Sequence, residues 1–107
     1  MVLDQDGILC SCRALGHAGA GKAGSDIVCA AVSVLIRTVI GTLSKKKGVD
    51  IRYEAPEPGL VWLQAGYSAE GKDSLAAAGE FLAEGLRSVA EEFPDNCNFF
   101  IRTDRRT

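Results

Sequence analysis

The chain has 107 residues, of which 47% are hydrophobic and 24% charged, and its formal net charge is −2. This length suits one domain spanning residues 1–107, and the composition excludes a disordered or fibrous chain. The slightly acidic balance argues against direct binding of nucleic acid, because nucleic-acid binders gather lysine and arginine to neutralise phosphates.

The start of the chain has no positively charged segment followed by an apolar stretch, so no secretory signal is expected. The apolar stretch from Ile27 to Ile36 is interrupted by Arg37 and is too short to span a bilayer. We therefore expect a cytoplasmic protein that makes no membrane contact and keeps its four cysteines reduced. Those cysteines are Cys10, Cys12, Cys29 and Cys97.

The first fifteen residues predict a hairpin. Ile8 to Leu15 alternate between two faces as a strand does, and one of these faces is expected to carry Ile8, Cys10, Cys12 and Ala14. The turn residues 4–7 precede this strand, so residues 1–3 are expected to form the stub of its partner.

A long helix is predicted from about Ile27 to Lys46. Ser25 or Asp26 caps its start, and Gly48 supplies the left-handed residue that ends it. The helix is apolar nearly all round, so we expect it to pack on the sheet and also on another surface, such as a second subunit.

The second half of the chain predicts a hairpin over 49–54 and 60–65, and then a helix over 73–93 that Pro94 ends. A last strand is expected to carry Cys97, Phe99 and Ile101 on one face. The order ββαββαβ predicts an α+β two-layer sandwich with a mostly antiparallel sheet and two helices.

The glycine-rich segment before the first helix resembles a phosphate-binding loop. Gly16 to Lys22 reads G-x-x-x-x-G-K, but Ala23 stands where Ser or Thr would hold magnesium. We therefore expect neither a nucleotide nor another cofactor, although backbone N–H groups here could still hold an oxyanion.

A zinc site is the second alternative. Cys10 and Cys12 share one predicted strand face, but the paired C-x₂-C spacings of zinc sites are absent. We therefore expect no metal site.

A reactive thiol at Cys29 is the third hypothesis. At 100° per residue, four side chains fall within roughly 80° on the first helix and form a polar stripe: Asp26, Cys29, Ser33 and Arg37. Cys29 is expected in the first turn, where N–H dipoles favour an anion. The glycine-rich loop could bring His17, the chain's one histidine, against it.

Each of these residues also has an ordinary structural explanation. Cys29 stands among Ile, Val and Ala, as a small core residue typically does. A single histidine in a loop, such as His17, is typically just solvated. Asp26 either caps the helix or orients His17. The hydroxyl of Ser33 is expected to bond back to the carbonyl of Cys29.

The segment from Gly16 to Ser33 resembles the signature of the bacterial ribosomal-processing cysteine proteases, Prp. It carries Gly16-His17-Ala18, then a short glycine-containing loop, and then Gly24-x-Asp26-Ile27-Val28-Cys29-Ala30-Ala31-Val32-Ser33. The rest of the chain follows that family's layout of hairpin, helix, hairpin, helix and last strand.

This resemblance implies a homodimeric cytoplasmic endopeptidase that cuts after an aromatic residue. Its substrate would be the precursor of a large-subunit ribosomal protein, the twenty-seventh in the bacterial naming scheme, from which it removes an N-terminal extension. By position, His17 is the general base and Cys29 the nucleophile, with Asp26 and Ser33 in support. The alternative from another class is a noncatalytic ribosome-associated module that binds a protein.

Backbone N–H groups at the helix start and in the loop are expected to hold the oxyanion of the reaction and to contact substrate. The loop residues concerned are Gly16, Gly19, Gly21 and Gly24.

Overall fold

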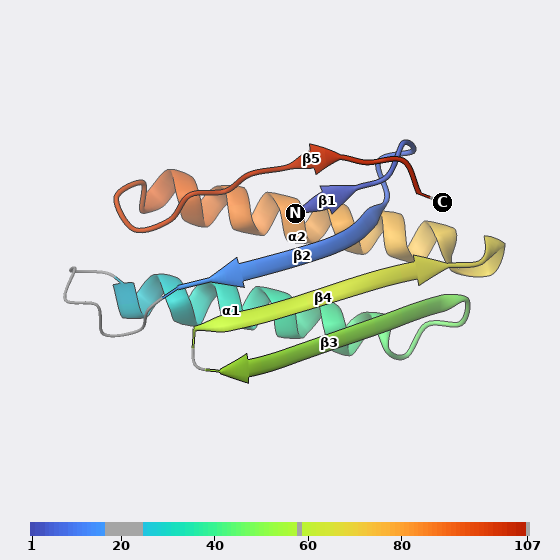
Figure 1. Cartoon of the computed structure of the whole chain (residues 1–107), viewed down its shortest axis with the longest axis horizontal. Coiled ribbons are helices and arrows are strands. Elements are labelled where there is room, and N and C mark those ends of the chain that lie inside the picture. Colours follow the sequence, from blue (N-terminus) through green and yellow to red (C-terminus); the bar gives the residue numbers. More distant parts are fainter. Residues whose placement is uncertain (17–24, 58, 107) are drawn as a thin grey trace.

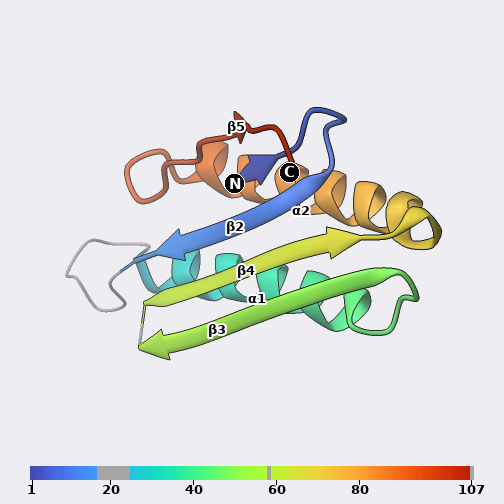
Figure 2. The ribbon, with the colours of Figure 1, turned by 45° about the vertical axis from the view of Figure 1, so that its right-hand side comes forward.

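The computed structural model of the chain describes residues 1–16, 25–57 and 59–106 (Figure 1). In this part of the chain a five-stranded sheet has the order β3-β4-β2-β1-β5. Two helices cover one of its faces, α1 behind β3 and β4 and α2 behind β1 and β2 (Figures 1 and 2). The predicted α+β two-layer arrangement is therefore confirmed. The elements are β1 (Val2–Leu3), β2 (Leu9–Leu15), α1 (Ser25–Leu43), β3 (Val49–Glu57), β4 (Leu60–Tyr67), the 3₁₀ turn η1 (Ala69–Gly71), α2 (Lys72–Glu92) and β5 (Arg102–Thr103).

The sheet is mostly antiparallel, as predicted. Three strand pairs, β1–β2, β2–β4 and β3–β4, are antiparallel, and only β1–β5 is parallel among the described pairs. The register shifts between Val2↔Ser11 and Leu3↔Leu9, which leaves Cys10 as an extra residue in β2. This bulge breaks the predicted alternation, because Leu9 and Cys12 are both buried while Cys10 is only half-buried.

The last strand lies further along the chain than predicted. The alternation of Cys97, Phe99 and Ile101 suggested a strand there, but β5 comprises Arg102–Thr103. Its partner β1 pairs only from Val2, opposite Arg102, so residues 97–101 have no neighbouring strand in the described chain. The strand prediction for these residues was wrong because alternation cannot show whether a partner strand exists.

α1 supplies much of the core, and a turn that depends on a glycine lies between this helix and β3. Ile36, Val39 and Leu43 are buried against the sheet and α2. Gly48 is left-handed as predicted, with φ +79, but it lies in the turn before β3. Its predicted role as the residue that ends the helix, and the predicted end near Lys46, were wrong because α1 already ends at Leu43. A Cβ on Gly48 would also stand 2.4 Å from the backbone nitrogen of Gly71, so this position can hold only glycine.

α1 carries apolar side chains both on the face that packs in the core and on its exposed side. By length and composition alone, Asp26–Leu43 is long and apolar enough to cross a membrane, because this helix continues past Arg37, where the apolar stretch from Ile27 was taken to end. The core accounts for one apolar face of the helix. Ile27 and Val34 lie outside that face. They are 59% and 52% exposed, so the core does not cover them.

Candidate active site

Cys29 lies on α1 beside the end of β2. The helix begins at Ser25, so Cys29 stands just beyond the first turn rather than within it, as was predicted. Its side chain is half-buried and faces Gly16, on which a Cβ would stand 3.4 Å from the Cys29 Sγ. Gly16 is held there because its N–H donates to the carbonyl of Gly59 at 2.7 Å. The thiol therefore lies against the point where the chain leaves β2.

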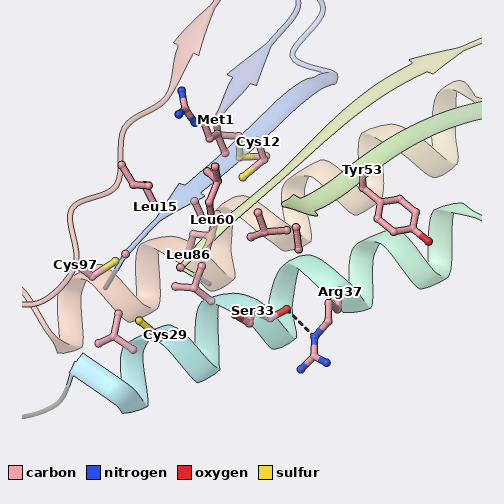
Figure 3. Close-up of a pocket in the computed structure, with 18 of the residues that line it drawn as sticks. Met1, Cys12, Leu15, Cys29, Ser33, Arg37, Tyr53, Leu60, Leu86 and Cys97 are labelled. Carbon is pink, nitrogen blue, oxygen red and sulfur yellow. Dashed lines mark hydrogen bonds between the residues drawn. The ribbon is translucent and has the colours of Figure 1, made fainter. Parts of the chain in front are cut away.

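A groove extends from Cys29 along α1, between this helix and the sheet (Figure 3). Its volume is about 1740 Å³, which exceeds the roughly 300–1,000 Å³ of typical small-molecule sites and suits an extended peptide. Much of the polar stripe predicted on the helix lines this groove, at Cys29, Ser33 and Arg37. The other walls include Leu15, Tyr53, Leu60, Cys97, Phe99 and Phe100.

The two supporting residues lie on α1 on either side of Cys29. Asp26 is inside the first turn rather than at the predicted cap, and its carboxylate complements the helix dipole there. Ser33 lines the groove, and its carbonyl accepts a hydrogen bond from the Nε of Arg37 at 3.4 Å (Figure 3). The Ser33 hydroxyl makes no hydrogen bond to the Cys29 carbonyl in the described structure, so the expected back-bond was wrong.

The other three cysteines have thiols whose pKa is raised by burial. Burial raises the pKa of the Cys12 thiol, which is only 3% exposed in the core. It also raises the pKa of the Cys10 and Cys97 thiols. Because the thiolate is the nucleophilic form, these three side chains are poor nucleophiles at neutral pH.

Several predicted residues lie outside the described residues: His17, Gly19, Gly21 and Gly24. The same holds for most of the phosphate-loop pattern, from residue 17 onward. Gly16 is described, and its N–H is engaged by Gly59 rather than directed at the groove. Within residues 1–16, 25–57 and 59–106, no three His, Cys, Asp or Glu side chains gather into a metal site.

Sequence reasoning missed the groove wall that follows α2. Phe99 is partly buried against the core, Phe100 is 77% exposed, and both line the groove with Cys97. The order of the elements was the one signal that could have revealed this wall. α1 and α2 run antiparallel, so the end of α2 at Pro94 returns the chain to the start of α1 (Figure 1).

A half-buried cysteine near the start of a helix, at one end of a peptide-sized groove, is the arrangement of a small thiol-dependent hydrolase on an α+β scaffold. Residues 1–98 match the model of the family described as "Cysteine protease Prp". The chain therefore belongs to the Prp family and is a cysteine protease. This family assignment excludes the noncatalytic binding module.

Solved structures share the fold. A protein from Streptococcus mutans, SMU.848, is 28% identical with a TM-score of 0.73, and the match covers 96% of this chain and 90% of that one. The essential ribosomal processing protease Prp from S. aureus, in complex with a substrate peptide, is 19% identical with a TM-score of 0.71 over 98% and 94% of the two chains. The same S. aureus enzyme with a covalently linked product peptide has a TM-score of 0.66 at 21% identity, with the same coverage. No curated protein matches the chain.

Proposed function

We propose that this protein removes the N-terminal extension of the twenty-seventh large-subunit ribosomal protein, with Cys29 as nucleophile and His17 as general base. The observation that carries the proposal is that the Cys29 Sγ lies 3.4 Å from the place where a Cβ on Gly16 would stand. His17 follows Gly16 in the sequence, and it is the chain's one histidine, so it is assigned as the base.

The proposed reaction has two chemical stages. His17 takes the thiol proton, the Cys29 thiolate attacks the scissile carbonyl, and the protonated imidazole then gives its proton to the leaving amine. Water, activated by His17, hydrolyses the resulting thioester. Asp26 is assigned to orient the imidazole, and Ser33 to support the groove beside the nucleophile.

Backbone N–H groups provide the proposed oxyanion site. Those at the start of α1 have no intrahelical acceptor, and we assign them this role together with the N–H groups of Gly19, Gly21 and Gly24. The N–H of Gly16 already donates to Gly59, so its proposed role is to leave room for the sulfur.

The groove supports a peptide substrate with an aromatic residue before the cut. Apolar side chains line it, among them Leu15, Leu60 and Phe99. Such walls favour a large apolar side chain, whereas Arg37 and the backbone are available for polar contacts further along the groove.

We also propose that the enzyme is a cytoplasmic homodimer. The exposed Ile27 and Val34 on α1 support this, because two copies packed through this helix would remove both side chains from water. A cytoplasmic setting would keep the nucleophilic thiol reduced.

The test uses the organism's own precursor protein with its extension intact. The wild-type enzyme should release one N-terminal peptide ending in an aromatic residue, as weighed by mass spectrometry. Cys29→Ser and His17→Ala variants should be slower by on the order of 10³-fold or more. An uncut precursor, or equal cleavage by Cys29→Ser, would contradict the proposed function.

A further inference from the structure

One wall of the groove is an irregular segment held at its two ends. We call residues 95–101 the strap, and residues 95–100 of it line the groove that contains Cys29. It has no regular secondary structure beyond the turn that follows α2. Figure 1 shows it running from the end of α2 to β5, which lies beside β1.

The upstream end of the strap is fixed by α2. The N–H groups of Asn96 and Cys97 both donate to the carbonyl of Phe93, at 3.0 and 2.9 Å. The downstream end relies on β1: the terminal ammonium of Met1 donates to the carbonyl of Phe100 at 2.9 Å, and the Arg102 N–H donates to the Met1 carbonyl at 3.0 Å. The β1–β5 pairing covers only two residues of each strand, which is a weak anchor by itself.

Arg106 provides a much stronger anchor just beyond β5. Its Nε donates to the Oδ2 of Asp4 at 3.0 Å, and its two terminal nitrogens donate to the carbonyls of Leu9 and Ala65, both at 2.8 Å. Its guanidinium carbon also lies 4.9 Å from the ring centroid of Tyr67. The paired residues of β2 and β4 begin at Ser11↔Gln64, so Arg106 joins the two strands beyond the end of their ladder.

Asp4 is suited to hold this arginine. It is 0% exposed, its Oδ1 accepts the N–H groups of Asp6 and Ile8, both at 2.9 Å, and its Oδ2 also accepts the hydroxyl of Tyr67 at 3.3 Å. The carboxylate is therefore fixed by the turn before β2. The family match ends at residue 98, so Arg106 lies outside the matched residues, whereas Asp4 lies within them.

We propose that Arg106 is a positioning residue for peptide binding. Its hydrogen bonds to Asp4 and to the ends of β2 and β4 hold β5 in place. Because the strap leads directly into β5, these bonds also keep Phe99 and Phe100 in the wall of the groove. The inference rests on the proposed function only where cleavage is measured.

The experiment compares Arg106→Ala with Arg106→Lys and with Arg105→Ala, which removes the same charge from an exposed neighbour. In Arg106→Ala, hydrogen exchange at residues 98–103 should accelerate, while β3 and β4 stay protected. At a temperature where every variant is folded, KM for the extension peptide should rise roughly tenfold with kcat within about twofold. The exchange rate and KM of Arg106→Lys should lie between those of the wild type and Arg106→Ala. Lysine can pair with Asp4, but it lacks the planar guanidinium that reaches two carbonyls.

A double-mutant cycle with Phe100→Ala separates positioning from general stability. Phe100 is 77% exposed, so its truncation should leave the unfolding free energy nearly unchanged while raising KM. In the Arg106→Ala background the same truncation should have no further effect on KM, since the wall is already displaced. Additive effects, or unchanged exchange and KM in Arg106→Ala, would overturn the proposal. If the wild-type enzyme cleaves nothing, the proposed function fails, and hydrogen exchange alone still decides whether Arg106 holds the strap.

Discussion

The sulfur of Cys29 lies against Gly16, the residue immediately before His17, and a Cβ on Gly16 would stand 3.4 Å from that sulfur. The backbone of Gly16 is outside the left-handed region, so a side chain there would crowd the thiol without straining the chain. We predict that Gly16→Ala lowers kcat/KM by about threefold and Gly16→Val by about 100-fold, because displacing a reacting group by an ångström has costs of this order.

The matched control for this position is Gly66→Val, where a Cβ meets nothing within 4 Å. It should cleave the peptide at the wild-type rate. Equal rates for Gly16→Val and Gly66→Val would show that the contact with the sulfur has no catalytic importance.

Alkylation should be selective for Cys29. Burial raises the pKa of the Cys12, Cys10 and Cys97 thiols, so few of their thiolates exist at pH 7, and raising the pH should increase their labelling. With limiting iodoacetamide at pH 7, peptide mass mapping should find Cys29 labelled at least about tenfold faster than the others. His17→Ala should slow this labelling. Faster labelling of Cys97, or no response to His17→Ala, would argue against a dyad.

Asp4 should make the fold sensitive to acid. Burial favours a higher pKa for Asp4, but the N–H of Ile8, the guanidinium of Arg106 and the N–H of Asp6 outweigh it, so the pKa of this carboxyl is lowered. Its stabilising contribution is complete above the unfolded pKa of about 3.9 and is lost as pH falls through the lower folded value.

Urea unfolding at a series of pH values measures this contribution. The free energy of unfolding of the wild type should fall as the pH is lowered from about 5 towards 2. Asp4→Asn should be less stable than wild type at pH 7 and should lose less stability on acidification. Asp50→Asn, which removes an exposed carboxylate from β3, serves as control. An Asp4→Asn variant with the wild-type acid dependence would contradict the assignment.

The outward face of α1 should determine the oligomeric state. Val34 is 52% exposed on α1 and Phe81 is 54% exposed on α2, so the two offer similar exposure on different helices. Val34→Glu should convert a dimer into a folded monomer in sedimentation velocity, because a buried carboxylate without a partner is costly. Phe81→Glu should leave the dimer intact. The reverse result would place the interface on α2.

Local signals predicted the fold where the determining contacts are local. The left-handed backbone of Gly48 could be assigned because that conformation favours glycine whatever surrounds it, although the helix itself ends at Leu43. The face of α1 that carries Cys29, Ser33 and Arg37 could likewise be assigned, since helical periodicity fixes which side chains share a groove.

Contacts distant in sequence were not predictable in this way. Cys10 reads as an ordinary member of an alternating strand, and only its pairing with β1 makes it a bulge. The hydrogen bond from Arg106 to Asp4 joins opposite ends of the chain. No sequence pattern around either residue indicates that the two are paired. Phe99 and Phe100 lie in the groove because of that long-range anchoring, so alternation alone assigned their segment to a strand.

In the proposed mechanism Cys29 forms a covalent acyl intermediate, which rapid-quench mass spectrometry of enzyme mixed with the extension peptide can detect. We expect a transient mass increase equal to the N-terminal product minus water, located on the tryptic peptide of residues 23–37 and absent from Cys29→Ser. Cleavage that proceeds without any adduct on this peptide, or with the adduct on another cysteine, would contradict this mechanism.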